Sequence, residues 1–420
     1  MAELTITGKP TGDNANWNFD VNLLDITFFT LGASLVARDT VMPVFVSQLT
    51  DSKFAIGLIP AIFSLCFYLP QLLIANFSER LRYKKPFTML LGGVGERGGY
   101  LLIGLSIWLF AKHSPTLALV LIFIALAISA TSSGLCTPAW FDMIAKVIPV
   151  KRRGLWSGLS HSLGALMGVI GALFVGRILE NNPYPNNFAL LFFLTYGLLL
   201  ISFIGLALNR EPPSETVKQH ISLARYLRQL PEILRRDHNY LRFLVSRTTV
   251  QLGAMATGFF MVYGTERFQI DGQGVGLLTA ILVGSAAVMN LVWGFVGDRL
   301  GHKIVLAGAA FAMALAALTA WLAVSPVWLM VTFALIGVYS AGDGVSGFNI
   351  ILEFCAPADR PTYIGLTNTL LAPILTVAPL LGGWLAMTLD YSGLFLIALV
   401  IAIIGGLLML FWVREPRVEA

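Results

Sequence analysis

Six ionisable residues lie inside long apolar stretches of this sequence, where water does not reach them. They are Arg38, Asp39, Glu96, Arg97, Arg247 and Asp343. In the centre of a bilayer each charged side chain costs roughly 2.5–3.5 kcal/mol, so six of them cost on the order of 15–20 kcal/mol. Charges in that setting pair with one another or line a wet cavity, where they are suited to binding a polar solute or carrying a proton.

Helical rise, counted from the ends of the apolar stretches, indicates which charges meet. Arg38 and Asp39 lie about 14 Å from one end of their stretch, and Glu96 and Arg97 lie about 20 Å from the same side. Neighbouring residues on a helix point about 100° apart, so Arg38 is not expected to neutralise Asp39. We therefore expect Arg38 to pair with Glu96 and Asp39 to pair with Arg97.

Arg247 and Asp343 form the third expected pair. Counted from the opposite side, they lie roughly 10 Å and 15 Å deep, which is within one helical turn of each other. Gly342 and Gly344 flank the aspartate, and we expect them to weaken its helix and let a ligand approach the backbone. Interrupted helices in membranes commonly hold binding sites.

Local sequence distinguishes Asp39 from the pair Glu96 and Arg97. Pro43 lacks the amide that would bond the Asp39 carbonyl, so this turn offers a carbonyl acceptor as well as a carboxylate. We favour a functional role for Asp39 and Asp343 over a purely structural one. Glu96 and Arg97 lie in the run G-G-V-G-E-R-G-G, which is equally typical of close helix packing.

Composition places these residues in a membrane protein. Of 420 residues, 56% are hydrophobic and 12% are charged, whereas soluble domains carry about 25% charged residues. The odd count of three cysteines indicates neither a disulfide framework nor a zinc site. We find no nucleophile elbow or phosphate loop and expect no enzyme activity, cofactor or metal. A net charge of +5 would indicate nucleic-acid binding only if the positive charges formed a basic face on a soluble domain. We therefore expect no nucleic-acid binding.

Twelve segments are long and apolar enough to span a bilayer as helices. The polar N-terminal residues contain no cleavable leader, so we expect the first segment to remain as an anchor. The predicted spans cover residues 22–48, 54–77, 86–111, 115–146, 154–178, 187–209, 240–264, 273–296, 303–324, 326–352, 362–388 and 392–413.

The distribution of positive charge predicts the orientation. Of the 28 Lys and Arg residues, only Lys53, Lys112, Arg177 and Arg267 fall in odd-numbered loops. The positive-inside rule therefore places both termini and all even-numbered loops in the cytoplasm, with the chain crossing the cytoplasmic membrane. The longest polar loop contains I-S-L-A-R-Y-L-R-Q-L, which suits either a basic amphipathic helix on the inner leaflet or a solvated linker helix.

An internal duplication divides the chain into two six-helix halves. Both halves leave the membrane in Arg-Glu-Pro, and polar landmarks recur in the same order. The matches include Gly57 with Gly276, Phe141-Asp142 with Phe348-Asn349, Arg153 with Arg360, and Gly176 with Gly383. We expect a cytoplasmic tail at 1–21, a first bundle at 22–209, a cytoplasmic linker at 210–239, a second bundle at 240–413 and a tail at 414–420.

The loop between spans 8 and 9 resembles a known family motif. It reads G-F-V-G-D-R-L-G-H-K and is similar to G-x-x-x-D-R-x-G-x-K/R, the cytoplasmic loop motif of the major facilitator superfamily. A degenerate copy lies between spans 2 and 3. The residues carrying the resemblance, which we expect to form a cytoplasmic gate, are Gly294, Asp298, Arg299, Gly301 and Lys303, with Glu79 and Arg80 in the copy.

A second signature of that family is an acid followed by an arginine at the inner ends of helices 4 and 10. Asp142 and Lys146 lie at this end in the first half, where Arg153 matches Arg360, and Glu353 and Arg360 lie there in the second. Lys146 stands where the repeat places Glu353, so the first half departs from the pattern. The resemblance also implies that helices 1, 4, 7 and 10 line a central cavity.

The resemblance implies a secondary transporter that exposes one central site alternately to each side. We expect a monomer that moves a small organic solute, with protons coupled through Asp39 or Asp343. Export is slightly favoured, because helices 5 and 11 match three and four of the six positions of the family's antiporter signature. The alternatives are a symporter or uniporter importing a sugar or an organic anion, with Arg38 or Arg247 binding a carboxylate, and a membrane sensor that transports nothing.

If the loop between spans 8 and 9 latches helix ends in one conformation, its aspartate must contribute to the latch. Asp298→Asn is expected to slow transport while leaving the amount of protein in the membrane unchanged. Solute uptake by cells, compared with surface expression of the same cells, measures both quantities. Unchanged transport would contradict the latch.

Overall fold

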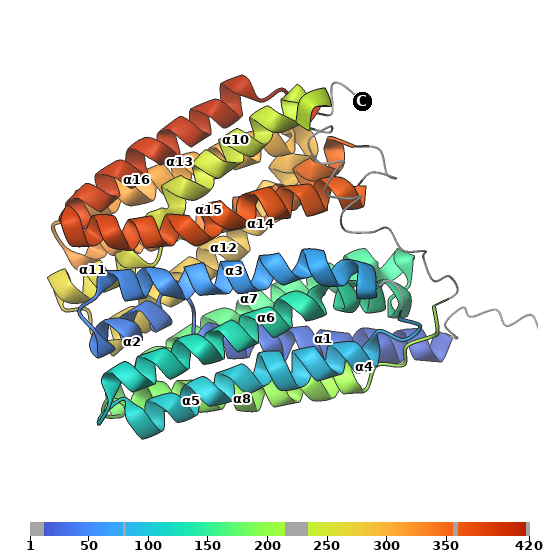
Figure 1. Ribbon diagram of the computed structural model, residues 1–420, viewed down its shortest axis with the longest axis horizontal. Helices are drawn as coiled ribbons and strands as arrows, with labels where there is room; N and C mark the ends of the chain where they lie inside the picture. Colours follow the sequence, from blue (N-terminus) through green and yellow to red (C-terminus); the bar gives the residue numbers. More distant parts are fainter. Residues whose placement is uncertain (1–11, 79–80, 215–233, 356–359, 417–420) are drawn as a thin grey trace, which may run out of the picture.

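The computed structural model describes residues 12–78, 81–214, 234–355 and 360–416, and all regular structure within these ranges is helical. The helices form two bundles that lie side by side (Figure 1). The first bundle contains α1 (Gly12–Leu35), α2 (Val41–Leu49), α3 (Lys53–Ser78), α4 (Lys85–Thr88), η1 (Met89–Arg97), α5 (Gly98–Phe110), α6 (Pro115–Val147), α7 (Val150–Asn181) and α8 (Asn186–Ala207). The second contains α10 (His238–Gly253), η2 (Ala254–Ala256), α11 (Phe259–Phe268), α12 (Gly272–Leu300), α13 (His302–Trp321), α14 (Pro326–Glu353), α15 (Arg360–Thr388), α16 (Asp390–Leu407) and η3 (Leu408–Trp412).

These elements make up the twelve expected spans, and three of the spans are interrupted. In the described part of the chain, nine helices are long and apolar enough to cross a membrane: α3, α6, α7, α8, α12, α13, α14, α15 and α16. The first span breaks between α1 and α2, the third contains the π-helix η1, and the seventh breaks around η2. The same three spans carry five of the six charges singled out in the sequence.

The break in the first span follows from Pro43. The Met42 amide reaches back five residues to the Ala37 carbonyl at 3.1 Å, and the Val44 amide bonds the Thr40 carbonyl at 3.4 Å, so the helix restarts at Val41. The expected weakening of the helix around Asp343 is wrong, since α14 runs unbroken from Pro326 to Glu353.

The flanking glycines of Asp343 serve packing in one case and leave open space in the other. A Cβ built on Gly342 would lie 2.7 Å from the Ala309 Cβ and 3.1 Å from the Trp293 Nε1, so this glycine lets neighbouring helices approach closely. A Cβ on Gly344 would meet no described atom within 4 Å. Glycine flexibility therefore does not interrupt the helix here.

The first helix also begins earlier than the predicted start at residue 22. Helix α1 starts at Gly12, and its asparagines bind the end of α8. Asn18 and Asn22 exchange hydrogen bonds with Arg210 and Asn209, for example from the Arg210 amide to the Asn18 Oδ1 at 2.8 Å. Hydropathy alone predicts a loop where asparagines cluster. Here their side chains form hydrogen bonds to residues at the end of α8, so the helix extends through them. The amphipathic helix expected in the long polar loop lies mostly outside the described residues.

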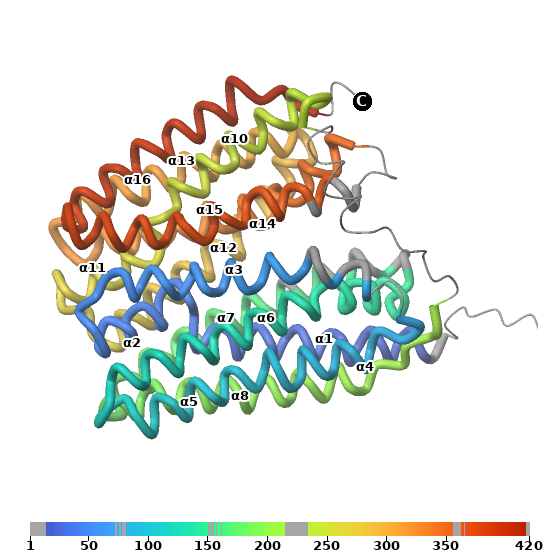
Figure 2. The backbone as a smooth tube through the Cα atoms, viewed as in Figure 1, coloured from blue at the N-terminus to red at the C-terminus, as the bar shows by residue number. Residues whose placement is uncertain are grey.

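Both ends of the described chain lie at the same end of the molecule, here named the terminal end, and α2 and α11 lie at the opposite, distal end (Figure 1). The two bundles approach each other at the distal end and diverge toward the terminal end (Figure 2). Across the distal approach, the Thr279 hydroxyl donates to the Thr40 Oγ1 at 2.9 Å.

Four glycines let the halves come together, and they are the glycines that recur in the sequence repeat. Gly57 of α3 and Gly383 of α15 face each other's helices, as do Gly176 of α7 and Gly276 of α12. A Cβ on Gly57 would lie 2.3 Å from the Pro379 carbonyl oxygen, and a Cβ on Gly276 would lie 2.7 Å from the Ala172 carbonyl oxygen. The repeat therefore preserves the contact points between the halves.

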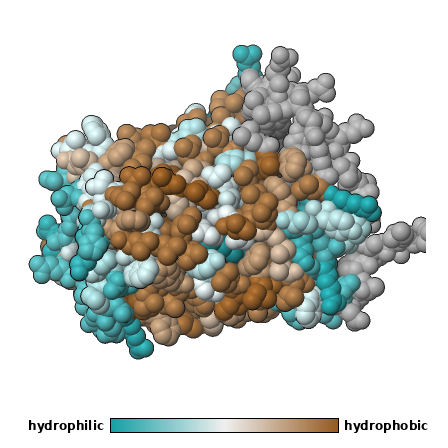
Figure 3. Space-filling model, turned by 60° about the horizontal axis from the view of Figure 1, so that its bottom comes forward, coloured by the Kyte–Doolittle hydropathy of each residue, from teal (hydrophilic) through white to brown (hydrophobic). Residues whose placement is uncertain are grey.

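The outer surface is that of a multi-pass membrane protein. A broad apolar band separates two polar ends (Figure 3). Large side chains on this surface are highly exposed, including Phe411 at 78% and Leu291 at 76%. Soluble proteins rarely expose contiguous apolar patches beyond a few hundred Å², so this band is the part that contacts lipid.

The contact between the halves predicts an unequal response to two glycine replacements. Gly57→Ala places a methyl group against backbone and is expected to destabilise the protein by about 1–3 kcal/mol, a typical cost of overpacking. Gly197→Ala, in an exposed turn of α8 with no described atom within 4 Å of its Cβ, is expected to be neutral or to stabilise by about 0.5–1 kcal/mol. Thermal unfolding of both purified variants measures the difference. Equal stability would show that the halves do not depend on this contact.

Candidate functional site

A cavity of about 200 Å³ lies between the two halves. Its wall comes from the break in the first span, from α3, from the break in the seventh span, and from α10, α12, α14 and α15. The polar groups on this wall are Asp39, Ser64, Gln251, Thr257, Tyr339 and Ser340. Both interrupted spans thus face the cavity, as in membrane proteins that place binding sites at discontinuous helices.

The expected ion pair between Arg247 and Asp343 is present. The Arg247 Nη1 donates to the Asp343 Oδ1, and the arginine side chain is 7% exposed. Gly347, one turn after Asp343, leaves room for the guanidinium, because a Cβ there would lie 2.5 Å from the Arg247 Nη2. An arginine buried beside a carboxylate keeps its charge compensated at this depth.

Two residues that sequence reasoning missed connect this pair to the cavity. The Gln251 Nε2 donates to the Asp343 Oδ1 at 3.1 Å, and the Tyr339 hydroxyl donates to the Gln251 Oε1 at 3.1 Å. Gln251 lies four residues after Arg247 on α10, and Tyr339 lies four residues before Asp343 on α14, so each shares a helix face with its charged neighbour. That spacing is the signal from which both were predictable.

Arg38 and Asp39 lie together in the break of the first span. Both are exposed, and Asp39 lines the cavity. The Arg38 Cζ lies 3.5 Å from the centroid of the Phe63 ring, which is a close cation–π contact. Among the described residues, neither side chain forms an ion pair with Glu96 or Arg97, so both expected pairs are wrong.

Arg97 instead binds Asp25, another residue that sequence reasoning missed. The Arg97 Nη2 lies 3.0 Å from the Asp25 Oδ1 and donates to the Ser202 Oγ at 2.8 Å. Its Nε donates to the Leu199 carbonyl at 3.1 Å, and its Nη1 donates to the Gly92 carbonyl at 2.6 Å. Because α1 begins at Gly12, Asp25 lies deeper than a span starting at residue 22 suggests.

Glu96 and its glycine-rich run serve close packing in η1. The Glu96 Oε2 lies 3.9 Å from the Arg97 Nη1, and the Glu96 carbonyl accepts from the Ser129 Oγ at 2.8 Å. A Cβ on Gly95 would lie 2.1 Å from the Ser132 Oγ. The packing alternative for this run thus agrees with the structure, and Glu96 and Arg97 belong to a network separate from the central cavity.

The predicted gate loop of the second half is held at the terminal end by residues that follow η3. Gly301 has a positive φ of 96°, and a Cβ there would lie 2.3 Å from the Glu415 Oε2. The Lys303 Nζ donates to the Val413 carbonyl at 3.2 Å. Gly301 therefore allows a tight turn and a close approach to Glu415.

The other residues of this loop contact their own helix or lie on the surface. The Arg299 Cζ lies 4.0 Å from the Phe295 ring centroid, and Asp298 is exposed at the end of α12. Gly294 makes no close helix contact, because a Cβ there would meet no described atom within 4 Å. The latch proposed for this loop stays a prediction.

In the first half the glutamate of Arg-Glu-Pro also lies beside the start of the third span, but the charged residues around it differ. Glu211 of its Arg-Glu-Pro accepts hydrogen bonds from the backbone amides of Lys84 and Lys85 at 2.8 Å, so it caps α4 as Glu415 approaches the start of α13. The Lys84 Nζ lies 3.1 Å from the Asp142 Oδ2. Lys146, the residue that departs from the family pattern, pairs with Glu211, since its Nζ lies 2.9 Å from the Glu211 Oε1.

Glu353, which the repeat matches with Lys146, has a different partner, since its Oε1 lies 3.8 Å from the His302 Nε2. The terminal ends of the two halves are therefore not equivalent in their charges. Of the remaining predicted gate residues, Glu79 and Arg80 lie outside the described residues. Arg153 lies in α7 and Arg360 begins α15, but their side chains are outside the described part of the chain.

The network around Arg97 predicts a specific pattern of stabilities. Arg97→Met leaves Asp25 buried without its countercharge and is expected to lower the free energy of unfolding by about 3–5 kcal/mol. Adding Asp25→Asn removes the orphaned charge and is expected to restore part of the loss. The exposed Arg267→Met is the matched control and is expected to stay within about 0.5 kcal/mol of the parent. A double variant no more stable than Arg97→Met would contradict the pairing.

Comparison with known proteins agrees with this architecture. The chain is 23% identical over 398 residues to the uncharacterized MFS-type transporter MJ1317 of Methanocaldococcus jannaschii, covering 93% of this chain and 94% of that one. Over 146 residues, 34% of this chain and 35% of that one, it is 30% identical to the multidrug resistance protein MdtG of Dickeya zeae. The fold is similar to that of the nucleoside transporter NupG, with a TM-score of 0.74 at 11% identity over 95% of this chain and 100% of that one. The model of the Major Facilitator Superfamily matches residues 26–265 and 243–420, so the chain belongs to that family.

Proposed function

We propose that this protein is a secondary active transporter that moves a small organic solute through the cavity between its halves, by alternating access and with coupled protons. One observation carries the proposal. The cavity is lined by the interrupted first and seventh spans and joined by hydrogen bonds to the pair formed by the buried Arg247 and the half-buried Asp343. A site made by both halves changes its exposure when the halves rock against each other.

The arrangement of the halves supports an inward-facing state. From the distribution of Lys and Arg we infer that the terminal end, with both termini, lies on the cytoplasmic side of the membrane. The four repeated glycines hold the halves together at the distal end, which then faces outward. The solute would enter the cavity from the cytoplasm and leave after the halves part at the distal end.

Two carboxylates are suited to carrying the proton, and they differ in what protonation changes. Asp39 lines the cavity, and no described cation forms an ion pair with it, so it exchanges a proton without breaking a bridge. Asp343 is bound by Arg247 and Gln251, so protonating it weakens the ion pair with Arg247 at the wall of the cavity. Proton binding at Asp343 would therefore change the contacts at the wall of the solute cavity. Proton binding at Asp39 would instead remove a negative charge from the cavity.

Export is supported by sequence rather than by geometry. The relative MdtG, which shares 30% identity over a third of this chain, is named a multidrug resistance protein. Two of the three glycines of helix 5 that match the antiporter signature have packing roles, because a Cβ on Gly171 would lie 2.2 Å from the Ser34 Oγ and one on Gly176 would lie 3.0 Å from the Gln273 Cα. The signature therefore adds little to the direction of transport.

A second candidate, import of an organic anion, is favoured by Arg38. This arginine is exposed in the break of the first span, and its described partner is the face of Phe63 rather than a carboxylate. A guanidinium without an acidic partner can bind a carboxylate of the solute through two parallel hydrogen bonds. A neutral or cationic drug-like solute would gain nothing from this group.

Proteoliposomes test transport and coupling together. The purified protein is expected to change the pH of the lumen only when solute is present, because proton movement and solute movement are one cycle. Asp39→Asn or Asp343→Asn is expected to abolish the pH change, while Asp51→Asn in the exposed first loop is the matched control and is expected to retain it. Lumenal pH dye fluorescence measures the proton, and radiolabelled candidate solutes measure the cargo.

The outcomes separate the alternatives. Solute exchange that continues without pH change in both aspartate variants indicates a uniporter or exchanger. Loss of affinity in Arg38→Gln for an anion, with none for a neutral solute, indicates the anion importer. A parent protein that binds solutes in a thermal-shift screen but carries none into liposomes would be a sensor, and proton-coupled transport would be rejected.

A further inference from the structure

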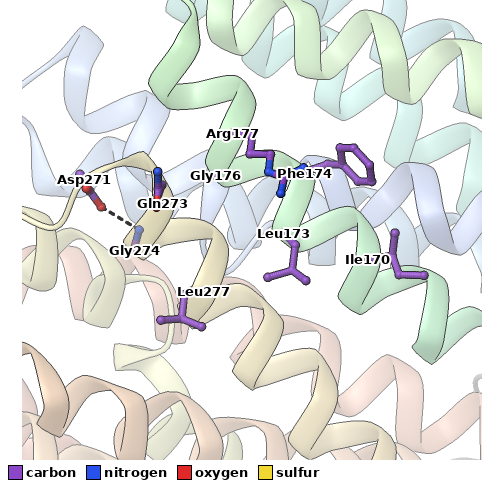
Figure 4. A pocket seen from close by; sticks show the side chains of 9 residues that line it. All are labelled: Ile170, Leu173, Phe174, Gly176, Arg177, Asp271, Gln273, Gly274 and Leu277. Atoms are coloured by element: carbon purple, nitrogen blue, oxygen red, sulfur yellow. Dashed lines mark hydrogen bonds between the residues drawn. The ribbon is translucent and has the colours of Figure 1, made fainter.

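A second cavity, of about 690 Å³, opens on the side of the molecule between the distal ends of α7 and α12 (Figure 4). It is larger than the central cavity and shares no lining residue with it, so it is a separate site. One wall belongs to the first half and the other to the second. Its volume falls within the range of about 300–1,000 Å³ typical of ligand pockets.

The wall from α7 is one face of that helix. Ile170, Leu173, Phe174 and Arg177 follow the spacing i, i+3, i+4 and i+7, and their side chains are drawn along the same stretch of helix in Figure 4. Leu173 and Phe174 are each 52% exposed, and Leu277 on the facing wall is 42% exposed. These side chains continue the apolar band of the surface into the cavity.

The charged groups of this cavity lie at one end of it, where the helices meet the distal surface. Arg177 is one turn before the end of α7 at Asn181, and Asp271 is the residue before α12. The Asp271 Oδ1 accepts from the Gly274 amide at 2.8 Å and so caps α12. Among the described residues, Arg177 has no hydrogen bond or ion pair, and its side chain is exposed at the rim of the cavity.

At this rim the Arg177 guanidinium has no described partner, while Asp271 is held as the cap of α12, and the floor below them is apolar. This arrangement matches a molecule with an anionic head and an apolar tail. A guanidinium binds phosphate oxygens in a bidentate fork, and the interfacial level of the bilayer is where lipid phosphates lie. We propose that this groove between α7 and α12, named the α7–α12 groove, binds a phospholipid of the surrounding leaflet, with its phosphate on Arg177 and an acyl chain along Leu173, Phe174 and Leu277.

The position of the groove gives such a lipid a consequence for conformation. Its two walls come from opposite halves, and Gly176 and Gly274 line it next to the contact that closes the distal end. A ligand that binds one conformation better than another shifts the population toward it. A phospholipid in the α7–α12 groove therefore favours the state in which the distal ends are together.

Lipid titration of the full-length protein in a non-ionic detergent tests the site. The unfolding temperature, followed by tryptophan fluorescence, is expected to rise with dioleoyl phosphatidylglycerol and to give an apparent affinity. Arg177→Gln is expected to weaken that affinity about tenfold, because a charge-assisted contact to phosphate is lost. Arg177→Lys is expected to keep most of it, and Lys112→Gln, which removes an exposed cation from another loop at the same end, is the matched control.

Two comparison compounds separate head from tail. Dioleoylglycerol lacks the phosphate and glycerophosphate lacks the chains, and each is expected to bind much more weakly than the phospholipid. Equal binding by either compound, or an Arg177→Gln protein that binds like the parent, would overturn the proposal. If Arg177→Gln does not fold, Leu277→Trp, which fills the apolar floor, decides, because undiminished lipid binding in that variant rejects the groove as the site.

Discussion

The cost of charge in a low-dielectric environment is the constraint on which the rest of this structure depends. Arg97 is met by Asp25, Ser202 and two backbone carbonyls, so its charge is fully compensated inside the first bundle. Arg247 is met by Asp343 between two helices that face the cavity. Compensation that is complete within one bundle stabilises that bundle, whereas compensation at the wall of the cavity can be exchanged for a solute or a proton. The chemistry of the protein is therefore set by where each charge finds its partner.

The second requirement is close contact between the two bundles. Glycines at the distal crossings of α3 with α15 and of α7 with α12 bring backbone against backbone, and these are among the most extensive helix contacts of the molecule. Small residues give close van der Waals contact where lipid offers no hydrophobic driving force between helices. The α7–α12 groove beside one crossing extends this contact to the surrounding lipid.

The two halves share a framework but not their chemistry. The register that matches Gly57 with Gly276 also matches Asp39 with Gly258, so both interrupted spans break at the same level while only the first carries charge there. At the terminal end each half places the glutamate of Arg-Glu-Pro at the start of its third span, yet Lys146 and Glu353 give the two ends opposite charges. Duplication supplied the scaffold, and substitution at few positions separated the roles.

The sequence by itself determined the twelve spans, the two halves and the pair between Arg247 and Asp343, because hydropathy, repeat order and helical rise depend only on local spacing. It did not determine the partner of Arg97, the breaks in the first and seventh spans, or the roles of Gln251 and Tyr339. Depth counted along one helix does not say which neighbour faces it, and a span that starts at residue 22 puts Asp25 near its end, whereas α1 begins at Gly12. Only the tertiary structure decided these contacts, because the choice of partner depends on helix rotation and helix breaks that bring together residues far apart in the chain.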